Sequence, residues 1–230
     1  MNRSKIEWTD YTWNPITGCT RGCAYCYARR MAYRLKGRCG YPQDEPFRPT
    51  FHPDRLLEPL EVKKPSKIFT VSMGEFFDTA VKDVWRGLVL EIMNWSLNHQ
   101  FLILTKQVEE LANYFEVLQL HPPGNLWLGI SQDGKTTNDN DIEFFRSLNY
   151  IPKKFVSFEP LLGPITSNFY GIDWIIIGAQ TGPRAQQPRR EWVHDILLEA
   201  DNWDIPVFIK NNLQWKGNTQ RPQEWPEVKT

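Results

Sequence analysis

The chain has 230 residues, enough for one large domain or two small ones with an ample hydrophobic core. Its 27 basic residues balance its 27 acidic residues, which excludes a protein that binds nucleic acid through a strong overall positive field; any such contact has to be local. No apolar run approaches the ~18 residues of a membrane helix, and the polar start M-N-R-S-K-I-E lacks the apolar stretch of a signal peptide. We therefore expect a cytoplasmic protein that makes no contact with a membrane, whose cysteines act as ligands rather than in disulfides.

From residue 67 onwards, short apolar runs alternate with longer amphipathic patterns. Strands are predicted at 68–72, 101–105, 126–131, 154–158, 174–178 and 206–209. Helices are predicted at 83–98, 108–118 and 190–200. Ile142, Phe144, Phe145 and Leu148 predict a further helix, capped by the Thr137-Asn138 region. In the first helix we expect one apolar face made of Val84, Leu88, Ile92 and Met93.

This alternation predicts an α/β fold whose parallel sheet is covered by helices, either an open doubly wound sheet or a complete or partial barrel. The sequence shows no internal domain boundary, so residues 1–230 are expected to form a single domain. A Pro-rich loop or insertion is expected at about 37–67.

Polar residues follow the predicted strands at their carboxyl ends, where ligands bind in both of these architectures. If the strands are parallel, their ends bring Glu75, Ser131, Glu159 and Gln180 around one mouth. Lys210 follows the last strand at the same edge. These side chains are candidates for holding a cofactor or a substrate.

Three cysteines, Cys19, Cys23 and Cys26, have the spacing C-x3-C-x2-C within G-C-T-R-G-C-A-Y-C-Y. Three thiolates in so short a loop can bind three irons of a [4Fe-4S] cluster, and Gly18 and Gly22 allow the loop to curl around it. The fourth iron stays open, and it can chelate the amino and carboxylate groups of S-adenosylmethionine (SAM).

The segments N-P-I-T-G-C-T-R-G-C-A-Y-C-Y-A, S-F-E-P-L-L-G-P, I-I-G-A-Q-T-G-P and V-F-I-K-N-N carry a resemblance across most of the chain. The cysteine spacing resembles the signature of the radical SAM superfamily. More narrowly, these segments resemble its phage-associated family of uncharacterised three-cysteine proteins, the phage protein Gp37/Gp68-like family. The resemblance implies a partial (β/α)6-type parallel barrel that holds the cluster and SAM at its carboxyl-end mouth.

Carried over residue by residue, the resemblance implies that Cys19, Cys23 and Cys26 ligate the cluster. Gly74 and Glu75 are similar to the superfamily's glycine-rich turn that meets the amino group of SAM, although only one glycine precedes the glutamate. Ser131 and Gln132 match positions that touch the ribose or carboxylate of SAM, with an ordinary loop start as the alternative.

Glu159 and Lys210 are candidate catalytic residues, because a carboxylate in a dry mouth can exchange a proton with the substrate. The alternative is a structural salt bridge between Glu159 and Lys106 or Lys210. An arginine cluster at 184, 189 and 190 could clamp an anionic group such as a nucleotide phosphate, or it could be a solvated helix entry.

Two other classes of protein remain open. Cys23 and Cys26 with Cys39 or His52 could form a structural zinc site in a non-catalytic α/β binding module that works with a partner protein. Residues 129–136 match the phosphate-loop pattern G-x4-G-K-[ST], with Lys135 as its lysine. Asp133 and the following N-D-N-D run oppose phosphate there, because they add negative charge.

We therefore expect an enzyme that uses a [4Fe-4S] cluster to cleave SAM and generate a 5′-deoxyadenosyl radical. Its electron would come from a flavodoxin- or ferredoxin-like donor. The aromatic content of 13% and the arginine cluster favour a nucleic acid or nucleotide as the substrate, which the sequence does not name.

Overall fold

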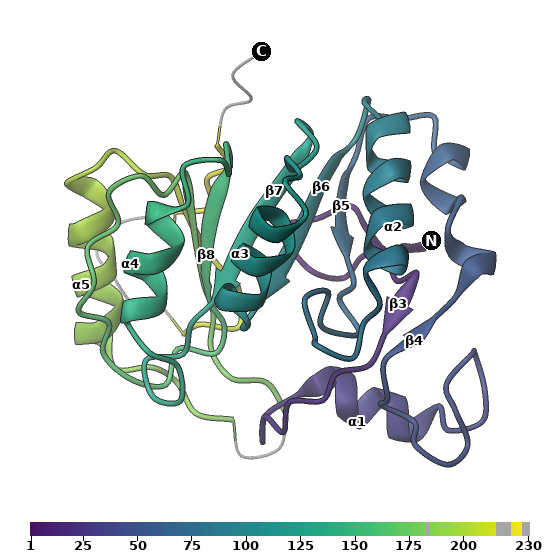
Figure 1. Ribbon diagram of the computed structural model, residues 1–230. Coiled ribbons are helices and arrows are strands. Elements are labelled where there is room, and N and C mark those ends of the chain that lie inside the picture. Colours follow the sequence, from purple (N-terminus) through teal and green to yellow (C-terminus); the bar gives the residue numbers. More distant parts are fainter. Residues whose placement is uncertain (183–184, 215–221, 227–230) are drawn as a thin grey trace. The chain divides into compact units, whose positions relative to one another are not determined.

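The computed structural model describes residues 1–182, 185–214 and 222–226. The chain forms two compact units, Met1–Trp127 and Leu128–Thr230. Strands and helices alternate in both units (Figure 1), and most strand pairs are parallel. The prediction of an α/β fold with a mainly parallel sheet is confirmed. None of the described helices combines the length and the apolar character that a membrane-spanning segment requires.

The first unit contains four strands of a sheet in the order β1-β2-β5-β6. The pairs β2–β5 and β5–β6 are parallel, and β1 adds an antiparallel edge. The strand bounds are Asn2–Arg3 (β1), Tyr11–Trp13 (β2), Lys67–Thr70 (β5) and Gln100–Thr105 (β6). A separate antiparallel pair joins β3 (Ile16–Thr17) to β4 (Thr50–Phe51).

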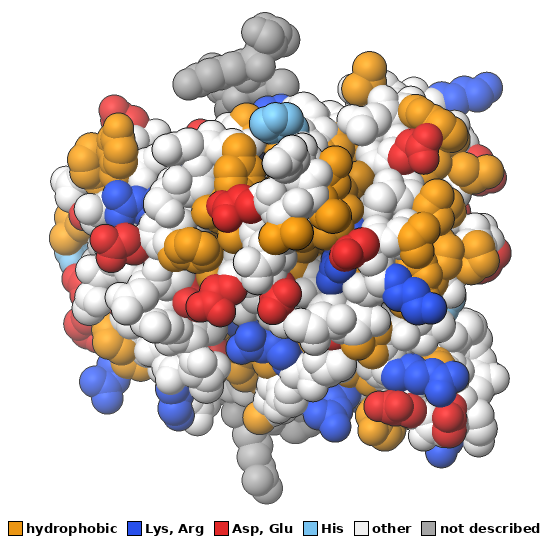
Figure 2. All heavy atoms as spheres, in the orientation of Figure 1, with side chains coloured by type: hydrophobic (Ala, Val, Ile, Leu, Met, Phe, Trp, Pro, Cys, Tyr) orange, Lys and Arg blue, Asp and Glu red, His pale blue; other side chains and the backbone are white. Residues whose placement is uncertain are grey.

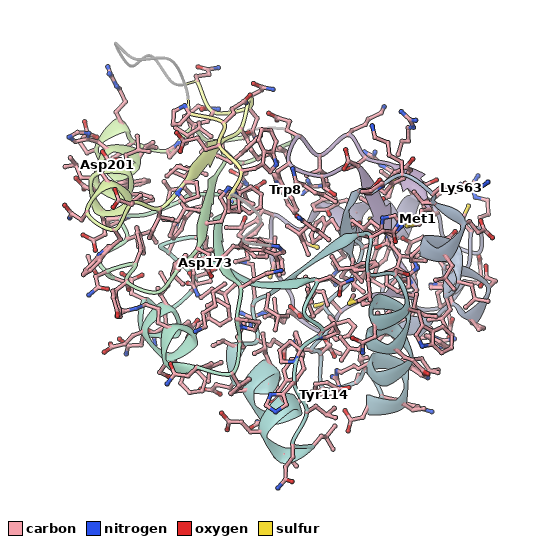
Figure 3. The ribbon with its side chains drawn as sticks, turned by 90° about the horizontal axis from the view of Figure 1, so that it is seen from above. Met1, Trp8, Lys63, Tyr114, Asp173 and Asp201 are labelled. Carbon is pink, nitrogen blue, oxygen red and sulfur yellow. The ribbon has the colours of Figure 1, made fainter. Side chains whose placement is uncertain are left out.

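Three α-helices belong to the first unit: α1 (Tyr27–Arg34), α2 (Asp83–Trp95) and α3 (Val108–Val117). In Figure 1, α2 and α3 run alongside the strands, whereas α1 lies at the foot of the unit. Figure 3 views the molecule from above and labels Tyr114, which belongs to α3. The predicted Pro-rich loop contains β4 and two short 3₁₀ helices, Pro53–Arg55 (η1) and Glu58–Glu61 (η2).

The second unit contains the strand order β7-β8-β9-β10, and the pairs β7–β8, β8–β9 and β9–β10 are parallel. Every residue of these four strands is buried, as expected for a parallel sheet covered on both faces. The element bounds are Leu126–Ser131 (β7), Asn140–Ser147 (α4), Lys154–Phe158 (β8), Trp174–Ile177 (β9), Arg190–Asp201 (α5) and Val207–Ile209 (β10).

The predicted elements match the observed ones to within about three residues at each end. The predicted apolar face of α2 is correct for Ile92 and Met93, which are buried, and wrong at its first residue. Val84 is 62% exposed, while Arg86 is buried in α2. The guanidinium of Arg86 donates to the backbone oxygens of Phe76 (2.9 Å) and Asp78 (2.6 Å), so its burial is compensated by hydrogen bonds. Hydrophobic periodicity could not predict this, because the partners are backbone oxygens of the loop that precedes α2.

Candidate functional site

The cysteine loop lies at the carboxyl end of β5, where it pairs with the Gly74-Glu75 turn. The Gly18 amide donates to Met73 O (3.0 Å), and the Glu75 amide donates to Gly18 O (3.0 Å). Gly18 has φ 92°, and a Cβ atom there would lie 2.2 Å from Arg48 O. A Cβ on Gly74 would lie 2.8 Å from Gly18 O. Both positions therefore require glycine, because the two backbones approach too closely for any side chain.

Two further contacts fasten this loop to the segments that follow β5 and β6. Asp78 is fully buried, and its Oδ2 accepts from the amide (2.7 Å) and the hydroxyl (2.9 Å) of Thr20. Arg21 Nη1 donates to the backbone oxygen of Lys106, directly after β6 (2.9 Å). Lys106 Nζ in turn lies 5.6 Å from the centre of the Tyr25 ring, within reach of a cation–π interaction.

All four cysteines are free thiols; Cys19, Cys23 and Cys26 are half-buried, while Cys39 is exposed. Two sulfur atoms accept backbone hydrogen bonds: Cys19 Sγ from the Arg21 amide, and Cys26 Sγ from the Arg29 amide at the start of α1. Burial, together with the nearby carboxylates of Glu75 and Asp78, raises the pKa of Cys19 to about 12. In the metal-free protein this thiol keeps its proton at neutral pH.

The donor atoms of the cysteine loop decide which metal group it suits. Cysteine thiolates are the usual ligands of iron–sulfur clusters, and this short loop supplies three of them. In the described part of the chain, no three His, Cys, Asp or Glu side chains already stand together as a metal site. The loop therefore has the right donor atoms for a cluster, but its three sulfur atoms would have to move closer together to bind one.

Of the other residues proposed for zinc, His52 is hydrogen-bonded within the fold, whereas the Cys39 thiol is exposed. His52 is buried, its Nε2 shares a 2.8 Å hydrogen bond with Thr17 Oγ1, and burial lowers its pKa to about 4. The backbone oxygen of Cys39 accepts from Arg55 Nη2 (2.6 Å), while the thiol side chain is on the exposed surface. Neither contact places these two residues with the cysteine loop.

Glu75 is buried, and hydrogen bonds fix both of its oxygens. Oε1 accepts from Thr105 Oγ1 (2.7 Å) and the Phe77 amide (3.2 Å), and Oε2 accepts from the Lys106 amide (3.0 Å). Burial raises the pKa of Glu75, against the effect of these donors. A carboxylate has about four acceptor positions, so one remains for a ligand. The side-chain amide nitrogen of the nearby Gln107 is buried and lacks a hydrogen-bond partner among the described residues.

A hollow of about 510 Å³ opens beside the cysteine loop, on the outer side of α1. Two cysteines and three arginines contribute to its wall. The lining residues are Gly22, Cys23, Ala24, Cys26, Arg29, Arg30, Tyr33 and Arg34.

In the second unit, Ser131 and Gln132 are both buried at the end of β7. Gln132 is 1% exposed, and its Nε2 lies 3.2 Å from Asp141 Oδ2. Its Oε1 lacks a hydrogen-bond partner among the described residues. A buried acceptor without a partner in the protein could accept a hydrogen bond from a bound ligand.

The phosphate-loop pattern that follows is closed by its own carboxylate. Asp133 is fully buried, and its Oδ1 accepts from the amides of Lys135 (2.9 Å), Thr136 (2.6 Å) and Thr137 (3.2 Å). These amides are the donors that a bound phosphate would need. The objection that Asp133 stands in the phosphate cradle is confirmed by this geometry.

Glu159 and Lys210 form an ion pair, with Nζ 2.5 Å from Oε2. A Cβ on Gly178 would lie 3.0 Å from side-chain carbons of both residues, so this glycine lets them approach across β9. Gln180 lies just beyond and is half-buried; its Oε1 accepts from the Gln186 amide (3.2 Å). Within the arginine cluster, Arg184 lies outside the described residues, and the Arg189 guanidinium stacks near Trp192 (5.4 Å).

The structure thus brings together Cys19, Gly74 and Glu75 in the first unit, and Glu159 with Lys210 in the second. That both groups share one mouth stays a prediction. Sequence reasoning missed Asp78, which anchors the cysteine loop. It also missed Asn14, whose Oδ1 accepts from the Met73 amide (2.8 Å). In the sequence, both residues are single polar side chains close to a motif, Asp78 after the Gly74-Glu75 turn and Asn14 before the cysteines, and nothing else there indicates their role.

A family model described as "protein of unknown function (DUF5131)" matches residues 3–226. The chain belongs to this family. The comparisons with curated proteins and with solved structures find no match. For this member of DUF5131, function has to be argued from the site.

Proposed function

We propose that this DUF5131 protein is a radical SAM enzyme on a partial (β/α)6-type barrel, with Cys19, Cys23 and Cys26 as ligands of a [4Fe-4S] cluster. One observation carries the proposal. The backbone pairing of Gly18 with the Gly74-Glu75 turn joins a three-thiol loop to a buried carboxylate at the end of a parallel strand. This arrangement supports a shared site for the cluster and SAM.

The residues of the loop favour binding of a cluster in several ways. Backbone amides of Arg21 and Arg29 donate to two of the three sulfur atoms, and such donors stabilise thiolate charge. Asp78 anchors the loop at Thr20 to the segment between β5 and α2.

Cys19, Cys23 and Cys26 would hold the cluster, which would supply the electron for reductive cleavage of the SAM sulfonium into methionine and a 5′-deoxyadenosyl radical. A flavodoxin- or ferredoxin-like protein would supply that electron. Glu75 would accept the α-ammonium group of SAM at its remaining acceptor position, while Thr105 and Lys106 hold the carboxylate in place. That Ser131, Gln132 and Gln180 of the second unit contact polar groups of SAM stays a prediction from the sequence.

Glu159 and Lys210 stay candidates for moving a proton at the substrate. Their ion pair supports the structural alternative as well, since each side chain is already satisfied by the other. Glu159→Gln should lower product formation without changing uncoupled SAM cleavage if the carboxylate takes part in chemistry. Equal loss of both would indicate a structural pair.

The test is anaerobic reconstitution followed by iron, sulfide and zinc analysis of wild type, Cys23→Ser and Cys39→Ser. We expect about four irons in wild type and Cys39→Ser, and loss of iron in Cys23→Ser. Dithionite-reduced wild type should release methionine and 5′-deoxyadenosine slowly without substrate. About one zinc and no iron would instead support the metal-stabilised binding module, and iron without SAM cleavage would contradict the enzyme.

Glu75 is tested separately, by SAM-binding calorimetry on cluster-loaded protein. Glu75→Gln should weaken binding by roughly tenfold or more while iron content is unchanged, because a charge-assisted hydrogen bond contributes ~1.5 to 3 kcal/mol. The control is Thr105→Val, which removes one donor to Glu75 but no charge. If the two variants bind SAM equally, Glu75 does not meet the ammonium group.

A further inference from the structure

The outer face of α1 is a stripe of basic and aromatic side chains. Cys26, Arg29, Arg30, Tyr33 and Arg34 recur at helical spacing, and all of them line the hollow. The opposite face carries Ala28 and Ala32, which pack with Tyr41 and Phe47 in a buried cluster. One side of α1 is therefore anchored in the first unit, and the other faces the hollow.

This stripe lies in a strongly positive segment of a chain whose net charge is zero. No acidic residue occurs between Asp10 and Asp44. The same segment contains the basic residues Arg21, Arg29, Arg30, Arg34, Lys36 and Arg38. Figure 2 shows basic side chains at the surface over α1. The positive field that composition excludes for the whole chain is thus concentrated here.

The arginines of the hollow are not neutralised by the described residues. None of the ion pairs within the described part of the chain involves Arg29, Arg30 or Arg34. Arg30 Nη1 donates to the backbone oxygen of Tyr25 (3.1 Å), which orients the guanidinium without cancelling its charge. The positive charge of the hollow therefore favours an anionic ligand.

Tyr33 favours a ligand that also has a planar group. Tyr33 is 54% exposed and lies between Arg29, Arg30 and Arg34 on the same face. An exposed aromatic ring among phosphate-binding groups is the arrangement that stacks an unpaired base while arginines hold the backbone. An acidic protein would match the arginines but would leave the ring without a planar partner.

We propose that this stripe binds single-stranded nucleic acid, with Arg30 and Arg34 on backbone phosphates and Tyr33 stacked on a base. Cys23 and Cys26 line the same hollow, so a bound strand would lie next to the cysteine loop. The inference names the substrate class of the proposed enzyme, and in that respect it rests on the proposed function. The binding step itself needs neither iron nor SAM.

The experiment measures fluorescence anisotropy of a labelled mixed-sequence single-stranded DNA of about 14 nucleotides, within the usual site sizes for such strands. Full-length protein is titrated both before and after anaerobic cluster reconstitution. The same titration is repeated at several salt concentrations. We expect binding in both preparations, and duplex DNA of the same sequence should bind at least tenfold more weakly.

The variants separate charge from stacking. Arg30→Gln with Arg34→Gln should weaken binding at least tenfold and reduce the salt slope by about 1.4, at about 0.7 per phosphate contact on a single strand. Tyr33→Ala should weaken binding about tenfold with an unchanged slope, because it removes a stacked base and no charge. The control is Lys63→Gln with Lys64→Gln, which removes the same charge from exposed positions after η2 and should leave binding unchanged.

Several results would overturn the inference. These are no binding, equal weakening in the control pair, or competition by poly-glutamate as effective as competition by unlabelled DNA, which would indicate an acidic protein partner. Inorganic phosphate that displaces the strand at equal phosphate concentration would indicate a small-anion site. A failure here with iron bound and SAM cleaved leaves the proposed enzyme standing, whereas DNA binding without iron or SAM cleavage leaves a nucleic-acid-binding module.

Discussion

Two loops of this chain carry sequence motifs for ligand binding, and they differ in whether hydrogen bonds within the protein occupy the groups that would bind the ligand. In the cysteine loop, residues 18–27, a carboxylate from outside the loop holds the backbone, and the three thiols remain available. In the G-K-T loop, residues 129–136, the carboxylate of Asp133 belongs to the loop and occupies its amides. A motif's spacing thus shows which donors exist, and tertiary hydrogen bonds decide whether they are free for a ligand.

The largest expected effect follows from removing the carboxylate behind the cysteine loop. Asp78→Ala leaves the amides of Thr20 and Ala80 without their acceptor, in a site with little solvent. We expect cluster content after reconstitution to fall at least fivefold and the free energy of unfolding to fall by about 2 to 4 kcal/mol. Iron analysis and denaturant unfolding measure these effects.

Glu91→Ala is the control for Asp78→Ala. Its carboxylate is exposed on α2, so its loss should change the free energy of unfolding by less than about 0.5 kcal/mol and leave cluster content unchanged. Equal effects of the two variants would show that Asp78 does not organise the loop.

The second effect concerns the G-K-T loop alone. Asp133→Ala leaves the amides of Lys135, Thr136 and Thr137 without their acceptor, and should lower the free energy of unfolding by about 2 to 3 kcal/mol. Cluster content should not change. Asp195→Ala, which removes an exposed carboxylate from α5, should have no effect on unfolding. A loss of cluster in Asp133→Ala would break the contrast between the two loops.

A smaller effect comes from pH, through the histidine next to β3. The pKa of His52 is about 4 in the folded protein, below its usual 6.5, so the unfolded chain binds more protons between these values. Its contribution to stability is present above pH 6.5 and is lost as pH falls towards 4, by about 1 to 3 kcal/mol. His52→Gln should flatten this part of the stability profile.

His194→Gln, on the exposed side of α5, is the control for His52→Gln. It should leave the pH profile of unfolding as it is in wild type. A parallel shift in both histidine variants would show that the burial of His52 does not set the slope.

The smallest effect is expected from Lys135→Ala. Because Asp133 fills the cradle, neither wild type nor this variant should bind magnesium–ATP in calorimetry, and their unfolding midpoints should agree. Tight ATP binding in wild type that disappears in Lys135→Ala would mean that the loop opens for phosphate after all.

The sequence by itself determined the order and type of the elements from residue 67 onwards. Buried strands such as Trp174–Ile177 are continuous apolar runs, and each helix has its own periodicity, so local pattern is sufficient there. The same is true of the cysteine spacing, because three thiols within eight residues are a local fact.

Only the tertiary structure decided which polar groups are available. Asp78 holds Thr20 from 58 residues away, and Lys210 pairs with Glu159 from 51 residues away. Arg86 is buried against the periodicity of its helix, because the loop that precedes the helix folds back to place its backbone oxygens at the guanidinium. The pattern of apolar residues predicts which face of an element is buried, because each residue contributes its own apolar area. The partners of a buried polar group cannot be predicted in this way, because they depend on which segments the fold brings together.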